Sequence, residues 1–290
     1  ASLERLPTMK HVLVAGALGQ LGSTFQRLAH RFPGLEFVWM DRNSLDITDP
    51  EAVSQALAQR RYSYLLNCAA YTAVDQAESE PEAADRINHL GACVLAQGCA
   101  DAGVHLVHIS TDYVFDGNSS IAYTPEDAPN PQGVYGVTKW KGEQCVSRYA
   151  QRYTTVRTSW LYDRTGKNFV QTMLRLSQTQ KELRVVNDQI GSPTFTEDLA
   201  WALGTHMEQG TLPKGITHFS NTGSCSWFEF AQAIFEERGI DIHVAPVSSA
   251  AYQAAAPRPA YSLLALTPQY PSRPWRAALK DALTTHNQTP

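Results

Sequence analysis

Apolar runs and amphipathic stretches alternate along the first two thirds of the chain. The short apolar runs predict β-strands near residues 10–15, 35–41, 62–69, 104–111 and 153–159. Between them, apolar residues recur at helical spacing and predict helices near residues 21–32, 49–60, 81–102 and 135–151. Strands that alternate with helices form parallel sheets through right-handed crossovers. The pattern therefore predicts an α/β fold with a Rossmann-type, doubly wound parallel sheet.

The alternation loosens after Trp160. Further helices are predicted near residues 166–180, 195–209 and 226–238, and short strands near 183–186, 216–220 and 242–247. Residues 248–262 are rich in Ala, Pro and Ser and are predicted to form a loop. The pattern alone leaves open whether this part forms a separate domain.

A glycine-rich turn joins the first predicted strand to the first predicted helix. Its residues are Gly16, Ala17, Leu18, Gly19, Gln20, Leu21 and Gly22. Such a turn lets the backbone approach a pyrophosphate at the helix N-terminus, where free N–H groups favour an anion. The second predicted strand ends at Asp41, nineteen residues beyond Gly22, close to the spacing expected for a carboxylate that binds an adenosine ribose. This order of elements predicts a nicotinamide dinucleotide site.

Asp41 is followed by Arg42, and the two side chains favour different cofactors. The Asp41 carboxylate accepts hydrogen bonds from a ribose 2′-hydroxyl and repels a 2′-phosphate, which favours NADH. The Arg42 guanidinium pairs with a 2′-phosphate and stacks on adenine, which favours NADPH. We therefore expect both NADPH and NADH to be accepted.

Tyr135 and Lys139 are candidates for catalysis because they lie four residues apart on a predicted helix and share one face. A Lys139 ammonium near the Tyr135 hydroxyl favours the phenolate, so we expect the pKa of Tyr135 to lie below its ordinary value of about 10. Ser110 and Thr111 end the fourth predicted strand. Ligands of doubly wound sheets bind in a crevice at the carboxyl ends of the strands. Because successive strand side chains face opposite sides, we expect only one of these two hydroxyls to face that crevice.

The composition adds several exclusions. The 290 residues carry a net charge of −4 and no basic run, which argues against nucleic acid as a partner. No apolar stretch is long enough for a membrane span. The five cysteines are odd in number and include no Cys-x-x-Cys pair, so we expect free thiols in a reducing cytoplasm and no zinc site. Residues 1–8 are predicted to be the remnant of an expression tag ahead of Met9.

The Gly-x-x-Gly-x-x-Gly turn, combined with Tyr135 and Lys139, resembles the extended short-chain dehydrogenase/reductase family, which acts largely on nucleotide sugars. Within this family, further segments resemble the dTDP-4-dehydrorhamnose reductases, and they are residues 67–75, 110–117, 157–160, 188–194 and 258–262. The resemblance extends from about Met9 to the final predicted helix. It implies a nucleotide-binding domain over residues 9–160 and a smaller C-terminal α/β lobe over residues 161–290 that binds the sugar nucleotide.

The resemblance also implies a reaction and its residues. The substrate would be dTDP-4-keto-6-deoxy-L-mannose (dTDP-4-dehydro-L-rhamnose), whose C4 carbonyl is reduced with NADPH or NADH. Thr111 would donate a hydrogen bond to the carbonyl oxygen, Tyr135 would supply the proton, and Lys139 would bind the nicotinamide ribose. The implied cofactor contacts are Gly16, Gly19, Gln20, Leu21, Gly22, Asp41, Arg42, Asp46, Ile47, Ala69, Ala70, Tyr71 and Lys139. The implied substrate contacts are Thr111, Asp112, Trp160 and Arg258.

Three related functions are alternatives. A dTDP-glucose 4,6-dehydratase needs an Asp-Glu pair after the threonine, whereas Thr111 is followed by Asp112 and Tyr113. A nucleotide-sugar 4-epimerase usually has a serine-rich segment at that place. The regulatory β subunit of methionine adenosyltransferase resembles the same subfamily and keeps the tyrosine and lysine, so a non-catalytic role stays open.

One further position bears on metal binding and on the assembly of subunits. Some members of the subfamily bind Mg²⁺ between subunits through a glutamate two places after the third glycine of the turn. Thr24 stands at that place, so we expect no metal and no metal-dependent dimer. The chain is expected to be a monomer or a homodimer.

Overall fold

The computed structural model describes residues 8–284 of the chain. Apart from Thr8, the segment predicted to be a tag remnant lies outside the described residues. Within the described part, no helix is both long enough and apolar enough to cross a membrane.

Six parallel strands form the main sheet, in the order β10-β5-β4-β3-β1-β2. Their bounds are β1 Lys10–Ala15, β2 Leu35–Met40, β3 Tyr64–Asn67, β4 His105–Thr111, β5 Tyr153–Thr158 and β10 Gly215–His218. The strand order reverses between β1 and β3, and ligands of doubly wound sheets bind at the carboxyl ends of the strands beside such a point. The predicted Rossmann-type sheet is confirmed.

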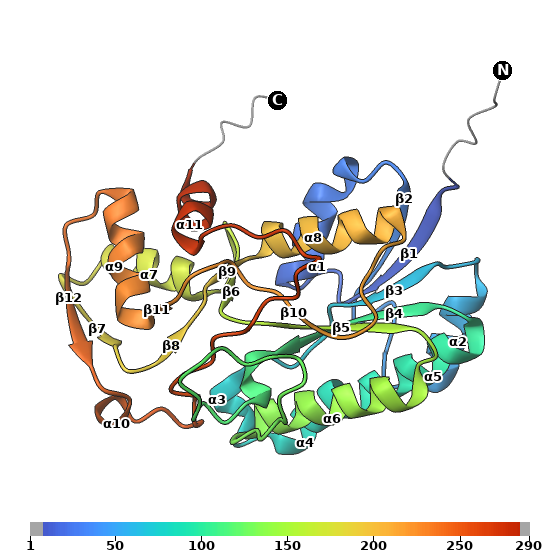
Figure 1. The fold of residues 1–290 in the computed structure, drawn as a ribbon, viewed down its shortest axis with the longest axis horizontal. Coiled ribbons are helices and arrows are strands. Elements are labelled where there is room, and N and C mark those ends of the chain that lie inside the picture. Colours follow the sequence, from blue (N-terminus) through green and yellow to red (C-terminus); the bar gives the residue numbers. More distant parts are fainter. Residues whose placement is uncertain (1–7, 285–290) are drawn as a thin grey trace.

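Helices cover both faces of this sheet (Figure 1). On one face, α1 (Gln20–Leu28) and α8 (Thr196–Gln209) pack against the sheet, with Phe25 and Leu203 fully buried between them and Val14. On the other face lie α2 (Pro50–Ala58), α5 (Ala92–Ala102) and α6 (Val134–Tyr149). The alternation of Leu13 and Val14 between the two clusters follows from the two-residue period of a strand.

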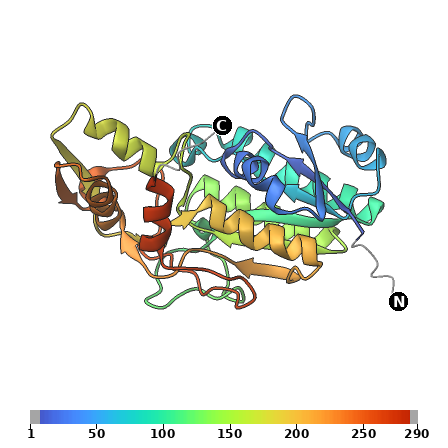
Figure 2. The ribbon, with the colours of Figure 1, turned by 90° about the horizontal axis from the view of Figure 1, so that it is seen from above.

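A smaller lobe lies beyond the end of the sheet (Figure 2). It contains α7 (Phe169–Ser177), α9 (Trp227–Arg238) and α11 (Trp275–Leu283), with β7 (Glu182–Val186) paired to β12 (His243–Val247). Two further short pairs are β6 (Leu161–Tyr162) with β9 (Thr194–Phe195) and β8 (Ile190–Gly191) with β11 (Cys225–Ser226). The division at residue 160 stays a prediction, and α8 and β10 of the later half complete the helix layer and the edge of the main sheet.

Short helices complete the chain, and one predicted helix differs in detail. They are α3 (Val74–Ala77), α4 (Pro81–Asp85), α10 (Ser249–Tyr252) and the single turns 29–31 and 112–114. The helix predicted over 81–102 consists of α4, a π-helical stretch over Arg86–Gly91, and α5. Helical spacing of apolar residues does not distinguish such a local widening from a regular α-helix.

The cysteines correct the prediction that all thiols are free. Cys93 on α5 and Cys145 on α6 form a disulfide, with Cα atoms 4.9 Å apart, whereas Cys68, Cys99 and Cys225 are free. The two helices pack against each other, and this packing brings together residues that are 52 positions apart. Sequence spacing carries no signal for such a pair, because only tertiary contact sets the distance.

Candidate active site

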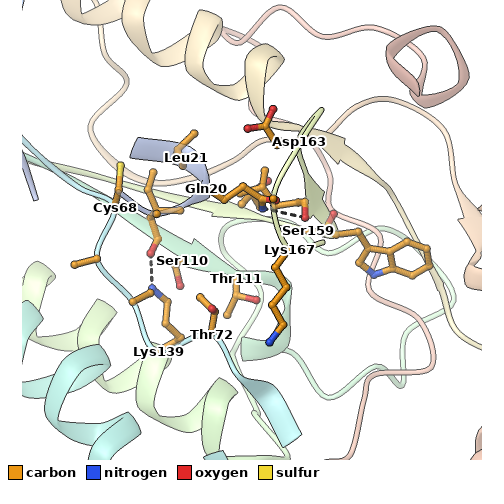
Figure 3. A pocket seen from close by; sticks show the side chains of 18 of the residues that line it. Gln20, Leu21, Cys68, Thr72, Ser110, Thr111, Lys139, Ser159, Asp163 and Lys167 are labelled. Carbon is orange, nitrogen blue, oxygen red and sulfur yellow. Dashed lines mark hydrogen bonds between the residues drawn. The ribbon is translucent and has the colours of Figure 1, made fainter. Parts of the chain in front are cut away.

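A cavity of about 690 Å³ lies at the carboxyl ends of β1, β3, β4 and β5 (Figure 3). Ten of the predicted site residues line it: Gly19, Gln20, Leu21, Ala69, Ala70, Thr111, Asp112, Tyr135, Lys139 and Trp160. Gly16, Gly22, Asp41, Arg42, Asp46, Ile47, Tyr71 and Arg258 do not line it. The sheet topology therefore brings the predicted catalytic residues and the glycine turn together in one space.

The glycine turn has the shape of a phosphate cradle. Gly16 has φ +72°, and a Cβ there would lie 2.5 Å from the backbone nitrogen of Ala69, so only glycine fits. A Cβ at Gly22 would lie 2.5 Å from the carbonyl oxygen of Gly16. Gly16 thus lets the turn pack against the backbone that follows β3, and Gly22 lets the start of α1 pack against the turn itself. Gly19 between them lines the cavity.

The N-terminus of α1 is open toward the cavity. Gly19 is the N-cap residue, no side chain caps the helix, and its first turn contains no acidic residue. The side-chain carbonyl oxygen of Gln20 is buried and has no hydrogen-bond partner among the described residues. Free backbone N–H groups at a helix N-terminus suit a pyrophosphate. The turn therefore fits a nicotinamide dinucleotide.

The residues predicted to contact the adenosine lie outside the cavity. The Asp41 carboxylate accepts hydrogen bonds from the backbone N–H groups of Asn43 and Ser44, each at 2.9 Å, and these contacts lower its pKa. Arg42 is exposed and has no ion-pair partner within residues 8–284. Asp46 accepts from the Thr48 hydroxyl at 2.7 Å, and Ile47 is buried in the core beneath it.

Tyr71, which follows β3, is anchored by two hydrogen bonds outside the cavity. Its hydroxyl donates to Glu80 at 2.7 Å, and its backbone N–H donates to the Asn88 side chain at 2.8 Å. The predicted contacts of Asp41, Arg42, Asp46, Ile47 and Tyr71 with a cofactor therefore stay predictions.

Thr111 and Tyr135 meet in the cavity from two different elements. Thr111 ends β4, and Tyr135 lies in the first turn of α6, where its ring packs edge-on against Tyr113 with centroids 5.4 Å apart. The Thr111 hydroxyl contacts the phenol oxygen of Tyr135. The Ser110 hydroxyl instead donates to Glu143 in the buried layer below. Of the two hydroxyls, Thr111 is therefore the one beside Tyr135.

The pKa of Tyr135 differs from the sequence-based expectation. Burial raises it to about 12, and the contact with Thr111 only partly opposes this rise. The expected lowering by Lys139 was wrong for this arrangement, because desolvation of the phenolate outweighs any neighbouring charge. The phenol therefore keeps its proton at neutral pH, which is the state that a proton donor requires.

Lys139 is buried beneath the cavity floor, one helical turn after Tyr135. Its ammonium group donates to the carbonyl oxygen of Ile109. Burial lowers the pKa of Lys139 to about 8, although the charge of Glu143 acts in the opposite direction. Glu143 forms a buried bidentate ion pair with Arg157 of β5, at 2.9 and 2.7 Å. This pair fixes α6 against the sheet and thereby fixes the position of Lys139.

Asp112 is a buried carboxyl group at the edge of the cavity. Burial raises its pKa to about 7, while hydrogen bonds from Ser262, at 2.6 Å, and from Thr111, at 3.2 Å, oppose this rise. Ser262 ends segment 258–262 (Arg-Pro-Ala-Tyr-Ser), one of the segments that carry the family resemblance. This segment therefore holds the carboxyl group next to Thr111.

Arg258, at the start of the same segment, is engaged in a different contact. Its guanidinium donates two hydrogen bonds to the carboxylate of Asp75, at 2.8 and 2.9 Å. The segment thus connects the C-terminal part of the chain to α3 and, through Ser262, to Asp112 at the end of β4. The predicted contact between Arg258 and a substrate stays a prediction.

Trp160 forms the lobe side of the cavity. Its backbone has φ +48°, a conformation that costs energy for a bulky residue and is found mainly where function requires it. Its ring stacks on Trp227 of α9, with centroids 3.6 Å apart and planes 10° apart. Sequence reasoning identified Trp160 but missed Trp227, because nothing in the sequence pairs the two rings.

Several lining residues were not identified from the sequence. They include Arg27, Thr72, Ser159, Asp163 and Lys167. Residues 163–168 form the connection between β6 and α7, hereafter called the β6–α7 loop. None of the segments that carry the resemblance includes the β6–α7 loop, and a loop of polar residues has no periodicity that could have revealed its place.

The doubly wound sheet, the open glycine turn, and the tyrosine and lysine on α6 define the class of short-chain dehydrogenases/reductases. The family model described as "RmlD substrate binding domain" matches residues 9–288, and the chain belongs to this family. The predicted subfamily is thereby confirmed.

Individual relatives agree with this assignment. The chain is 42% identical to the spore coat polysaccharide biosynthesis protein SpsK of Bacillus subtilis, over 95% of this chain and 97% of that protein. It is also 42% identical to a dTDP-4-dehydrorhamnose reductase of Mycobacterium tuberculosis, over 94% and 92%. The structure of dTDP-4-dehydrorhamnose reductase from Bacillus anthracis, in complex with NADP, aligns with a TM-score of 0.90 at 40% identity, covering 94% of this chain and 98% of that one.

Proposed function

We propose that this chain is an NAD(P)H-dependent oxidoreductase that reduces the C4 keto group of dTDP-4-dehydro-L-rhamnose to give dTDP-L-rhamnose. The observation that carries this proposal is the meeting of Thr111, Tyr135 and Lys139 with the open N-terminus of α1 in one cavity. The similarity to dTDP-4-dehydrorhamnose reductases supports the same reaction. The product is a nucleotide sugar used in the synthesis of cell-surface polysaccharide.

Three residues of the chain have different roles in the proposed reduction. A bound nicotinamide supplies the hydride that goes to the sugar C4 carbon. The Thr111 hydroxyl, which donates to Asp112 in the free chain, would rotate to donate its hydrogen bond to the carbonyl oxygen, where negative charge develops. Tyr135 transfers its phenolic proton to that oxygen. Lys139 lies one helical turn after Tyr135 with its ammonium group held by the carbonyl oxygen of Ile109, where it would bind the nicotinamide ribose. A positive charge at this position would favour the phenolate left after proton transfer.

The structure around Asp41 and Arg42 supports use of NADPH. Asp41 already accepts hydrogen bonds within its own turn, whereas the exposed Arg42 has no partner among the described residues. A guanidinium in this position suits a 2′-phosphate. NADH remains a second cofactor, because the second carboxylate oxygen of Asp41 can still accept from a ribose hydroxyl.

The remaining parts of the proposal concern assembly and location. We keep a cytoplasmic monomer or homodimer as the proposed form, with a sugar nucleotide as its small-molecule partner.

The test is a turnover assay with three substrates. NADPH oxidation is measured with dTDP-4-dehydro-L-rhamnose, with dTDP-glucose, and with a 4-keto-6-deoxy sugar that lacks the nucleotide. We expect turnover with the first substrate alone, because the remote nucleotide orients the carbonyl. Dehydration of dTDP-glucose consumes no NADPH overall, so the dTDP-glucose sample is also analysed by NMR, and a 4-keto-6-deoxy product there would support a dehydratase instead.

The same assay tests a non-catalytic role. A regulatory subunit would bind NADPH and would show no turnover with any of the three compounds. Binding of NADPH is measured in parallel by the change in its fluorescence. Binding without turnover would contradict the proposed reaction.

A further inference from the structure

The cavity contains five charged side chains, and four of them are engaged. The acids are Asp112 and Asp163, and the cations are Arg27, Lys139 and Lys167. Asp112 accepts from Ser262, and Lys139 donates to Ile109. Three charged groups remain to be examined as partners for a ligand, and they are Arg27, Asp163 and Lys167.

Arg27 and Asp163 neutralise each other. One Arg27 nitrogen lies 2.7 and 2.8 Å from the two carboxylate oxygens of Asp163, which is only 3% exposed. Thr24 donates a further hydrogen bond to Asp163 at 3.1 Å. The Asp163 carboxylate is buried and paired, so it is not available to an incoming ligand. Arg27 is held in this pair through one terminal nitrogen, and it lies on α1, the helix that begins at the glycine turn expected to hold the cofactor pyrophosphate.

Lys167 is the remaining charge. It is exposed, and within residues 8–284 its ammonium group forms no ion pair or hydrogen bond. In Figure 3 its side chain extends from the β6–α7 loop into the cavity, toward Thr72 and Thr111 and away from Gln20 and Leu21. The free cation therefore points to the part of the cavity expected to hold the sugar, and away from the turn expected to hold the cofactor pyrophosphate.

The β6–α7 loop is built to hold this lysine in place. The Asn168 side chain caps α7 and donates to the carbonyl oxygens of Asp163 and Thr165, at 3.1 and 3.0 Å. Gln171 donates to the carbonyl oxygen of Arg164 at 2.7 Å. Gly166 has φ +84° and turns the chain immediately before Lys167. Contacts at both ends of the loop thus present Lys167 at its tip.

A nucleotide sugar brings a diphosphate group into this cavity, and its charge requires a cation. Arg258, which the family resemblance assigned to the diphosphate, is bound to Asp75 through two hydrogen bonds and does not line the cavity. We propose that Lys167, presented by the β6–α7 loop, binds the diphosphate of the sugar nucleotide. This inference rests on the proposed function, because it names the residue that recognises that substrate.

The test compares the binding of dTDP to four forms of the full chain, measured by calorimetry in the presence of saturating NADPH. They are the wild type, Lys167→Met, Lys167→Arg and Lys181→Ala, the last being an exposed lysine outside the cavity. We expect Lys167→Met to raise the Kd for dTDP about tenfold, since it loses a charge-assisted contact. Lys167→Arg and Lys181→Ala should bind nearly as the wild type does.

Two further readouts separate a charge effect from a structural one. The Kd for dTDP should depend less steeply on salt concentration in Lys167→Met than in the wild type, because one exposed charge is lost. The Kd for NADPH should not change. Unaltered dTDP binding in Lys167→Met would overturn the inference, and so would a weakening of NADPH binding in place of dTDP binding. If the wild type binds no dTDP, the proposed function itself is wrong, and the inference that rests on it is wrong as well.

Discussion

The two sides of the cavity are built in different ways. The side that we propose to be catalytic, hereafter the catalytic side, consists of Thr111 at the end of β4 and of Tyr135 and Lys139 on α6. The buried Glu143–Arg157 pair fixes this helix to the sheet. The side that we propose to bind the substrate, hereafter the recognition side, consists of Trp160 and the β6–α7 loop, which leaves Lys167 exposed.

This difference separates the chemistry from the choice of substrate. Proton transfer depends on fixed positions and on pKa values that burial sets, and regular elements provide both. Recognition of a sugar nucleotide depends on shape and exposed charge, which loops supply on a rigid scaffold. We therefore expect changes on the catalytic side to lower kcat, and changes on the recognition side to act mainly through KM.

The largest expected effect is on the catalytic side. Tyr135→Phe removes the proton donor and should lower kcat by about 10²- to 10⁴-fold, with the Kd for NADPH unchanged. Tyr149→Phe, at the exposed end of the same helix, is the matched control and should keep full activity. Steady-state kinetics with the dTDP-sugar measures both variants, and near-normal kcat in Tyr135→Phe would refute the assignment.

The second effect is a pH dependence that originates from Lys139. Burial lowers the pKa of this group to about 8, so the ammonium loses its proton as the pH rises through that value. If the charge is needed, kcat/KM should fall above about pH 8, by about tenfold for each further pH unit. Lys139→Arg keeps its charge at every accessible pH and should remove this decline, whatever its absolute rate. A wild-type profile that stays level to pH 10 would show that the charge is not required.

The third effect is on the recognition side. Trp160→Ala removes the ring that stacks on Trp227 and should lower kcat/KM by about tenfold, mainly through a higher KM. Trp201→Ala changes an exposed tryptophan on α8 that does not line the cavity, and it should have no such effect. If kcat of Trp160→Ala falls as much as kcat/KM does, this residue belongs to the catalytic side.

The smallest effect concerns the choice of cofactor. Arg42→Ala should raise the Kd for NADPH about fivefold and leave that for NADH nearly unchanged, because an exposed charge pair is screened by solvent. Arg31→Ala, another exposed arginine, is the control. If Arg42→Ala weakens the binding of both cofactors equally, Arg42 stacks on adenine and does not bind the 2′-phosphate.

The sequence predicted the catalytic side better than the recognition side, for a physical reason. The helical period relates Tyr135 to Lys139, and the order of strand, turn and helix relates the glycines to a nucleotide. No such period relates Trp160 to Trp227 or places Lys167 over the cavity, since these contacts arise from packing between distant segments. The Cys93–Cys145 pair was missed for the same reason.

Electrostatics was the least predictable part of the site. The sequence suggested that Lys139 would lower the pKa of Tyr135, whereas burial raises it. The loss of solvation depends on the complete three-dimensional surroundings of a group, which residue spacing does not describe. The same reasoning explains the raised pKa of Asp112, whose burial depends partly on the distant Ser262 segment.

The central claim is that the chain delivers hydride to C4 of a nucleotide-linked keto sugar. The most direct measurement uses NADPH that carries deuterium at the transferable position of nicotinamide C4, with dTDP-4-dehydro-L-rhamnose as substrate and NMR of the product. The account predicts dTDP-L-rhamnose with deuterium at sugar C4 alone, and no such product from Tyr135→Phe over the same time. Deuterium at another carbon, or consumption of the substrate without transfer of deuterium, would contradict it.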